Sequence, residues 1–479
     1  MEIKVFNNLT RSKETFKTLE PGVVRYYSCG PTTYDFLHVG NARALVVGDL
    51  FHRVFRAMEL KVIFVRNYTD VDDKIIDRAK DLKVDALAHA SRFVKECEAD
   101  MNSLGMIAAT HTPKVSETMP EIITMIEELI KNGYAYVVEG EVLYNVPKFS
   151  DYGKLSKVKL DSLQHGIRVE VEGHKKHPSD FVLWKPTKPG EPFWDSPWGK
   201  GRPGWHIECS AMAKKFLGKT IDLHHGGVDL QFPHHENEIA QSEAANGCEF
   251  CHQWAHNEFL NFGSDKMSKS LGNVVTIRQF VEQYSGEILR HLLLSVHYRS
   301  KIEWSEEAIS KAITEVERIH EFKMLLDGFV ATEKEDKNEI LKFSNLLNEI
   351  KDELSNDFNV PGAMGLFFGV IKEFNRLSKM GMSNDVLLEV KKIATFIELA
   401  TGLINPDPKA VLARLNNARK NLSGTSGSNE DEINSLIEQR SVARSSKNWT
   451  RSDEIRNRLN ELGVVVKDNP DGTATWTYK

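Results

Sequence analysis

The side chains best suited to chemistry gather in one stretch, Trp205 to Glu238, which holds a cysteine, several histidines and several carboxylates. Within it, His234 and Glu238 lie four residues apart, a spacing that places an imidazole and a carboxylate on one face of a helix. Cys209 offers one thiolate, and Cys29, which follows a strand-like run, offers another. Thiolate, imidazole and carboxylate together suit zinc. We therefore predict one Zn²⁺ ion bound by Cys29, Cys209, His234 and Glu238.

The choice of histidine is open at this level. His224, His225 and His235 lie in the same stretch, and His235 shares a helical face with Glu238 at a spacing of three. A buried cysteine is more often a small apolar residue than a metal ligand. No short finger-like spacing closes the site. Spacing alone therefore leaves the imidazole ligand undecided among these histidines.

Another cysteine pair, Cys248 and Cys251, precedes His252 in the pattern of a haem c attachment site. Attachment of haem requires an exported protein, and the N-terminus lacks the apolar core of a signal peptide. The sequence has no second Cys-x-x-Cys pair that would complete a zinc ribbon. We interpret Cys248 and Cys251 as structural cysteines.

Polar residues that suit a phosphate follow the strand-like run at 23–29. His38, Gly40 and Asn41 stand at the start of an apolar helical stretch, where unpaired N–H groups and the helix dipole attract anions. Gly40 also allows a planar base to approach closely. An equally good interpretation is a helix start that holds a histidine and a capping asparagine. Neither GxGxxG nor GxxxxGK[ST] occurs, so a nucleotide would bind by other means.

Two more features suit a nucleotide. Asp229 follows Gly226 and Gly227 after the expected strand 220–223, where its carboxylate can accept hydrogen bonds from ribose hydroxyls. Lys266 and Lys269 lie three residues apart among serines and glycines, in a loop that can fold over phosphates. Such a pair of cations stabilises the charge that develops on a departing phosphate group.

The elements that must position these residues alternate between strand and helix. Apolar runs predict a strand at 23–29, a helix at 42–51, a strand at 61–67 and a further helix after Lys74. This order predicts a doubly wound parallel sheet of the Rossmann-like α/β class. Ligands bind at the carboxyl ends of the strands in such sheets, where Cys29 to Asn41 and Thr69 to Lys74 both fall.

The remaining chain divides by its pattern. A segment with a helix at 120–132 and strands at 134–138 and 141–146 interrupts the sheet domain. Helical periodicity dominates from Val275 onward, with long amphipathic runs. After the flexible linker 423–429, the end of the chain predicts two helices and a hairpin, with a basic surface beside Trp476. Trp476 stacks on an unpaired base if it is exposed, or forms the core of a small domain. The long runs are at 305–330, 337–356, 360–380 and 384–404.

The composition narrows the class of protein to which this chain can belong. The 479 residues are 41% hydrophobic and 27% charged, as in ordinary globular proteins, and the formal net charge of −6 argues against indiscriminate nucleic-acid binding. No apolar run approaches the length of a membrane span. We expect a cytoplasmic protein without a membrane association, in which the five cysteines are reduced.

Several strings together resemble a known family. KMSKS and the His38 to Asn41 segment are similar to the two signature motifs of class I aminoacyl-tRNA synthetases. The strings CGPTTYDFLHVGNAR, NYTDVDDKI, WHIECSAM, GGVDLQFPHHENEIAQSEA and KMSKSLGN, in this order, resemble the cysteinyl-tRNA synthetases. The resemblance covers roughly the first 300 residues closely and the remainder weakly.

The resemblance implies a role for each site residue. It selects His234 as the imidazole ligand of zinc, beside the two thiolates and Glu238. Thr69, Trp205 and His224 would contact the cysteine substrate. His38, Gly40 and Asn41 would meet ATP, with Asp229 at its ribose and Lys266 and Lys269 on the mobile loop. The first motif of the family usually ends in a second histidine, and Asn41 stands there instead. An amide can donate a hydrogen bond but carries no positive charge.

The resemblance also implies an activity and a domain order. The enzyme would activate L-cysteine with ATP and Mg²⁺ and transfer it to tRNA(Cys), as a monomer. The alternatives are an ATP-dependent cysteine ligase acting on an amino sugar and a zinc-stabilised RNA-binding protein without activity. The predicted segments are a catalytic first half at 1–115, an insertion at 116–202, a catalytic second half at 203–274, stem-contact helices at 275–320, an anticodon-stem bundle at 321–420 and a small anticodon-binding domain at 430–479.

Overall fold

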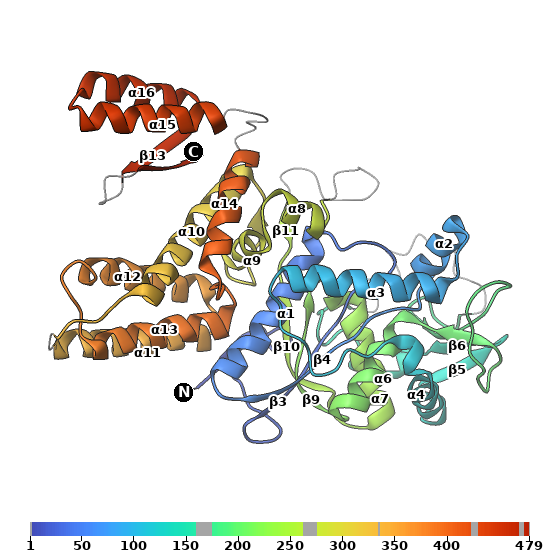
Figure 1. Cartoon of the computed structure of the whole chain (residues 1–479). Helices are drawn as coiled ribbons and strands as arrows, with labels where there is room; N and C mark the ends of the chain where they lie inside the picture. Colours follow the sequence, from blue (N-terminus) through green and yellow to red (C-terminus); the bar gives the residue numbers. More distant parts are fainter. Residues whose placement is uncertain are drawn as a thin grey trace.

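The computed structural model describes residues 2–159, 175–261, 275–333, 336–422, 430–468 and 474–478. Figure 1 shows an α/β domain that contains the N-terminus, a bundle of helices packed against it, and a small domain at the C-terminus. Within the described residues, no helix is long and apolar enough to cross a membrane.

The α/β domain is built on a parallel sheet, as predicted. Its strands run in the spatial order β10-β9-β3-β4, and every pairing is parallel. The chain winds outward from β3 to β4 on one side and from β9 to β10 on the other, so the winding changes direction between β3 and β9. The strands are β3 (Val23–Ser28), β4 (Lys61–Arg66), β9 (Ile221–Gly227) and β10 (Cys251–Asn257), and the helices between them include α1 (Val39–Ala57), α6 (Trp205–Leu217) and α7 (Glu236–Asn246).

Strand β9 is longer than the sequence predicted. The expected strand ended at Leu223, whereas β9 continues through His224 and His225 to Gly227. All seven residues are buried, and the pairing with β10 extends to Gly227 opposite Asn257. The neighbouring strands on both sides supply the partners that a local pattern cannot reveal. Both histidines therefore belong to the central sheet.

The segment between α3 and α6 forms a separate antiparallel sheet. Helices α2 (Asp73–Leu82) and α3 (Ala86–Ser103) precede this insertion, which begins with α4 (Met119–Lys131). Its sheet has the order β5-β6-β7-β8, with β5 (Ala135–Val138), β6 (Glu141–Tyr144), β7 (Phe181–Pro186) and β8 (Gly201–Pro203). Lys185 on β7 pairs with Asp73 on α2 at 3.0 Å, and Arg202 on β8 pairs with the same carboxylate. These contacts join the insertion to the domain that it interrupts.

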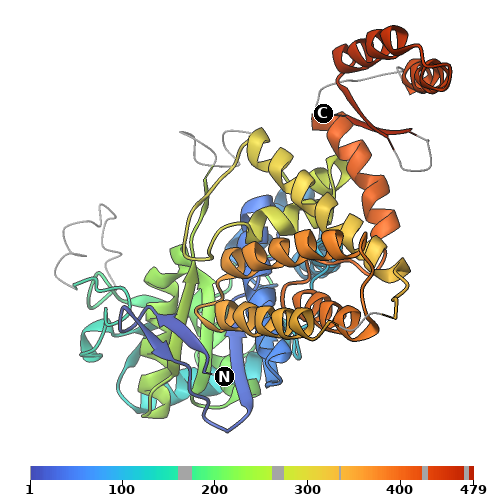
Figure 2. The same ribbon diagram turned by 90° about the vertical axis from the view of Figure 1, so that its left-hand side faces the viewer.

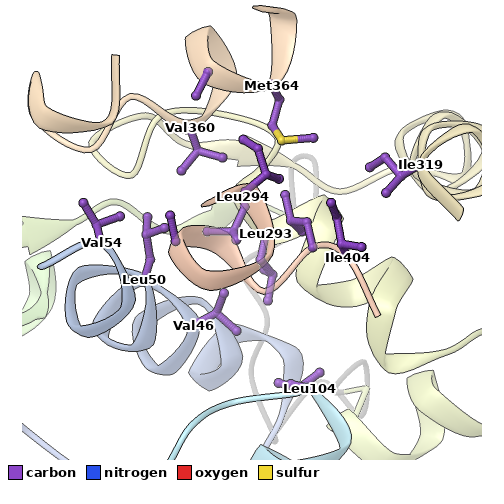
Figure 3. Close-up of a cluster of buried hydrophobic side chains, with 14 of the residues drawn as sticks. Val46, Leu50, Val54, Leu104, Leu293, Leu294, Ile319, Val360, Met364 and Ile404 are labelled. Atoms are coloured by element: carbon purple, nitrogen blue, oxygen red, sulfur yellow. The ribbon is translucent and has the colours of Figure 1, made fainter. Parts of the chain in front are cut away.

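The helical region after residue 275 confirms the predicted amphipathic runs. Helices α10 (Glu306–Gly328), α11 (Lys337–Ser355), α12 (Val360–Leu377) and α13 (Asn384–Thr401) coincide with them to within a few residues. Their apolar faces share one core with α1, against which α13 packs directly, and Figure 3 shows side chains of α1, α9, α10 and α12 meeting in it. The remaining elements here are α8 (Ile277–Gln283), α9 (Gly286–Leu294), α14 (Pro408–Leu422) and the short parallel pair β11 (Leu260–Asn261) and β12 (Ile302–Glu303), and an N-terminal hairpin joins β1 (Lys4–Asn7) to β2 (Ser12–Thr15).

The small C-terminal domain has the two helices and the hairpin that were predicted. Figure 2 shows it set apart from the rest of the molecule. Trp476 is half-buried against a core formed by Ile433 and its neighbours, and its Nε1–H donates to Asn434 Oδ1 at 3.0 Å. Of the two interpretations, the core of a small domain is therefore confirmed and the exposed stacking residue is not. The elements are α15 (Glu430–Ser445), α16 (Trp449–Glu461), β13 (Val464–Asp468) and β14 (Ala474–Tyr478).

Candidate metal centre and active-site cavity

Four predicted ligands from distant parts of the chain converge beside the carboxyl end of β3. Their donor atoms all lie within 4.8 Å of one another, and we call these residues the thiol set. The Sγ atoms of Cys29 and Cys209 are 3.9 Å apart, and Cys29 Sγ is 3.6 Å from Glu238 Oε1. The thiol set consists of Cys29, which follows β3, Cys209 on α6, His234, two residues before α7, and Glu238 on α7.

These separations match tetrahedral zinc. Bonds of about 2.0–2.3 Å from a tetrahedral ion place neighbouring ligand atoms roughly 3.3–3.8 Å apart. The distances from Cys29 Sγ to Cys209 and Glu238 fall close to that interval. His234 Nε2 and Glu238 Oε1 are nearer, at 3.0 Å, because imidazole and carboxylate form a direct hydrogen bond. The donor set and its spacing both fit a zinc ion.

A second group of donors meets the same distance criterion. This histidine set shares Cys29 and Glu238 with the thiol set but uses His224 and His235 in place of the other two ligands. His235 Nε2 lies 3.4 Å from Cys29 Sγ, and His224 Nε2 lies 2.9 Å from Glu238 Oε2. The alternatives that the sequence left open are therefore present in the structure as two overlapping clusters.

His225 belongs to neither cluster, because successive strand residues face opposite sides of a sheet. On β9, His224 faces α7 and contacts Trp254 and Tyr27. His225 points the other way, toward α1, where its Nδ1 is 3.1 Å from Ser28 Oγ. The strand assignment thus removes one of the four candidate histidines.

Two members of the thiol set favour the charged forms that bind a cation, whereas burial and the contact with Cys209 raise the pKa of the Cys29 thiol. The hydrogen bond from the Cys29 thiol lowers the pKa of Cys209 to about 6, against the opposing effect of burial. Burial raises the pKa of Glu238, but the positive charge available on His224 and His234 outweighs it and lowers that pKa to about 2. One thiol and the carboxylate are thereby inclined toward the anionic forms that bind a cation.

His206 is a neighbour of the cluster that the sequence reasoning missed. Its Nδ1 lies 2.9 Å from His234 Nδ1, so the two imidazoles share one proton. Burial, followed by the positive charge available on His234, lowers the pKa of His206 to about 3 and keeps it neutral. Trp205 stacks on the His234 ring at a centroid distance of 4.3 Å. The signal available in the sequence was the position of His206 between Trp205 and Cys209.

A cavity of about 700 Å³ opens beside the cluster, and Cys29 lies in its wall. It occupies the place that the change of winding predicts for a ligand. Trp205, Asp229, His38, Gly40 and Asn41 line it as the sequence predicted. Lining residues that the prediction missed include Tyr34, Lys74, Asn257, Phe259 and Lys301.

The start of α1 forms one wall of the cavity. His38 Nδ1 accepts a hydrogen bond from the Asn41 N–H at 3.2 Å, and Asn41 Oδ1 accepts one from the His38 N–H at 3.1 Å. A Cβ on Gly40 would lie 2.9 Å from the His38 ring, so only glycine fits without displacing that ring. The expected helix cap is present. Because Nδ1 accepts, the proton of a neutral His38 resides on Nε2.

The other predicted substrate contacts lie deeper or outside the described part. Thr69 and His224 are buried and do not line the cavity; Thr69 Oγ1 donates to Glu208 Oε2 at 3.3 Å. Their contact with the substrate stays a prediction. Lys266 and Lys269 lie outside the described residues.

Models of protein families match three parts of the chain. The model described as "tRNA synthetases class I (C) catalytic domain" matches residues 15–314. The model described as "Cysteinyl-tRNA ligase anticodon binding domain" matches residues 428–476, and the DALR domain matches residues 349–400.

Curated relatives match over the whole length. The cysteine–tRNA ligase of Geobacter metallireducens is 45% identical over 489 residues and covers 100% of both chains. That of Halalkalibacterium halodurans is 44% identical over 480 residues and covers 98% of each.

Solved structures share the fold at low identity. Mycobacterium tuberculosis methionyl-tRNA synthetase in complex with methionyl-adenylate superposes with a TM-score of 0.61 at 16% identity, over 81% of this chain and 93% of its own. The LeuRS of Agrobacterium radiobacter, in a ternary complex with tRNA, gives 0.61 at 10% identity, over 84% and 86%. These likenesses support the α/β fold.

Proposed function

The chain belongs to the class I cysteinyl-tRNA synthetase family, and on that premise we propose that zinc bound by the thiol set selects its amino acid. The chain is a ligase that activates cysteine and charges tRNA with it. The full-length matches decide against an amino-sugar ligase and against an inactive RNA-binding protein.

The observation that carries the proposal is the approach of two thiols, Cys29 and Cys209, to 3.9 Å beside an imidazole and a carboxylate. Zinc prefers such a mixed set with thiolates. Metal-bound histidines also donate their second N–H to a partner. In the thiol set, His234 Nδ1 has that partner in His206. In the histidine set, His235 Nδ1 has one in His256, but the buried His224 Nδ1 has none among the described residues. We therefore favour the thiol set over the histidine set.

The carboxylate ligand has an outer partner too. His224 Nε2 lies 2.9 Å from Glu238 Oε2, so the other oxygen, Oε1, faces Cys29 and His234. In this arrangement His224 orients the ligand Glu238 and is itself removed from the ion. Partners of this kind fix the direction of a ligand and tune its basicity.

The selectivity problem is the difference between cysteine and serine, which is one atom. A shaped apolar pocket separates such near-isosteres by only about 10²-fold. A zinc ion bound by the thiol set would bind a substrate thiolate far better than a hard alcohol oxygen. Cys29 and Trp205 lie in the cavity wall, so the substrate side chain can reach the cluster from the cavity.

At the other end of the cavity, the residues of α1 would bind ATP, supplied with Mg²⁺. His38 Nε2–H and the side-chain amide of Asn41 are the donors proposed for the phosphates, assisted by the helix N-terminus. The cysteine carboxylate attacks the α-phosphorus and pyrophosphate leaves, so no protein nucleophile is needed. Gly40 lets the nucleotide approach, and Asp229 would accept hydrogen bonds from the ribose.

Lys266 and Lys269 remain the proposed cations for the leaving pyrophosphate. The helices after residue 275 and the C-terminal domain would hold tRNA(Cys), consistent with the anticodon-binding match at 428–476. The predicted domain limits, the monomeric state and the cytoplasmic location stay predictions.

Zinc content and pyrophosphate exchange test this proposal together. Cys209→Ser should lose the bound zinc and cysteine-dependent exchange of pyrophosphate into ATP, because an alcohol is a poor zinc ligand. The matched control is Cys251→Ser, a buried cysteine on β10 outside both sets, which should retain zinc and exchange. Serine serves as the control substrate. A zinc-free Cys209→Ser enzyme that still activates cysteine would overturn the proposal.

A further inference from the structure

Asn67, the residue that follows β4, contacts both segments that carry the thiols. Its Oδ1 accepts a hydrogen bond from the Gly30 N–H at 2.9 Å, directly after Cys29. The same oxygen lies 3.9 Å from Cys209 Sγ. Asn67 is the first residue of the NYTDVDDKI string, is only 1% exposed and does not line the cavity.

The amide of Asn67 has a fixed direction. Its Nδ2 donates to Thr69 Oγ1 at 3.3 Å, and that hydroxyl donates to Glu208 Oε2 at 3.3 Å. Glu208 precedes Cys209 on α6. The chain of hydrogen bonds therefore runs from the loop after β3, through the end of β4, to the helix that supplies the second thiol.

The backbone of Gly30 packs closely on the same residue. Strands β3 and β4 pair in parallel up to Ser28 opposite Arg66, so Cys29 and Asn67 are the next residues of adjacent strands. A Cβ added to Gly30 would lie 1.6 Å from the Asn67 carbonyl oxygen. The first thiol-bearing loop is thus held against Asn67 by packing and by a hydrogen bond.

We propose that Asn67 is a positioning residue of the metal centre that holds the Cys29 and Cys209 segments at the separation that zinc requires. The inference rests on the proposed zinc site. Asn67 does not itself bind the ion; it fixes the Cys29-Gly30 backbone so that both thiolates point to one place. Partners outside the ligand shell typically change metal affinity by about 10–100-fold.

The test is a chelator competition that measures zinc affinity in the full-length protein. Asn67→Ala should weaken zinc binding by about 10–100-fold and change the visible d–d absorption of the cobalt-substituted enzyme, because the thiolates lose their alignment. Asn67→Asp keeps an acceptor for the Gly30 N–H but loses the donation to Thr69 and places a carboxylate beside Cys209 Sγ. It should recover only part of the lost affinity.

A matched control separates positioning from general stability. Asn7 is equally buried, at 2% exposed, and accepts hydrogen bonds from the N–H groups of Leu9 and Trp254. Asn7→Ala should lower the unfolding midpoint without changing zinc affinity or the cobalt spectrum. If Asn67→Ala does not fold, Asn67→Asp decides: weaker zinc binding and a shifted cobalt spectrum support the role of Asn67, and values identical to wild type refute it.

Different results would refute the zinc site and the positioning role of Asn67. Wild-type protein that binds no zinc through Cys209 would refute the proposed function. Wild-type protein that binds zinc there, with unchanged affinity and cobalt spectrum in folded Asn67→Ala, would refute the role of Asn67 alone.

Discussion

The two ends of the active-site cavity are built in opposite ways. At the α1 end, His38 and Asn41 are three residues apart and complete each other's hydrogen bonds within one helical turn. At the metal end, Cys29 and Glu238 are separated by 209 positions and meet through the winding of the sheet. The first end depends on local helix geometry. The second depends on tertiary structure, so it is the end that distant changes can disrupt.

Removal of a proposed zinc ligand should have the largest effect on the metal end of the cavity. Glu238→Ala deletes one donor to zinc and leaves His224 and His234 without their acceptor. Because even outer partners are worth about 10–100-fold, we expect zinc affinity to fall by more than ~10²-fold, with loss of cysteine activation. Elemental analysis and pyrophosphate exchange measure the two effects.

The control for this change lies on the same helix. Glu243 on α7 pairs with Lys154 at 2.5 Å and belongs to neither donor set. Glu243→Ala should retain zinc. Equal loss of zinc in both variants would mean that α7 folding, and not the ligand, was tested.

A smaller effect is expected at the α1 end. Asn41→Asp keeps the acceptor for the His38 N–H and places a negative charge where a helix N-terminus favours one, so the free energy of unfolding should not fall. The same charge repels the ATP phosphates and should raise the KM for ATP roughly tenfold. Zinc content should not change.

This variant separates the two interpretations of Asn41. A stable enzyme with an unchanged KM for ATP would show that Asn41 is only a helix cap. Asn41→His, which restores the usual family residue, is the companion measurement and should lower the KM or leave it as it is.

The smallest effect is a pH dependence at the metal end. The pKa of Glu238 is about 2 in the folded, zinc-free chain, against an ordinary value of 4.5. A carboxyl group whose pKa is lowered by folding stabilises the folded state fully at pH values above its ordinary pKa. This contribution to the free energy of unfolding is lost as the pH falls toward 2. Between pH 5.5 and 4 the loss amounts to about 0.8 kcal/mol.

The titration of His234 contributes little to the change in stability between pH 5.5 and 4. Its pKa rises to about 10, since the attraction of Glu238 outweighs burial, and both this and its ordinary value of 6.5 lie above pH 5.5. Denaturant unfolding of chelated wild-type and Glu238→Gln protein at the two pH values gives the difference. An identical pH slope for both proteins would contradict the assignment.

Several structural features were predictable because their signals are local. The apolar runs identified the parallel sheet and the long helices, and the segment from His38 to Asn41 predicted the helix cap that is observed. The strand containing His224 was predicted too short, because its last residues are stabilised by pairing with β10. The sequence left Trp476 either exposed or in the core of the small domain, because burial against Ile433 depends on how that domain packs.

The sequence by itself determined the residue types of the proposed zinc site, the α/β class and the helix start that lines the cavity. It could do so because helix and strand periods relate neighbours in the chain to directions in space. Only the tertiary structure decided that His225 faces away, that His206 and Asn67 lie beside the proposed ligands, and that two thiols lie 3.9 Å apart. The order of the strands in the sheet sets those distances. The long connections between the strands carry no local signal of that order.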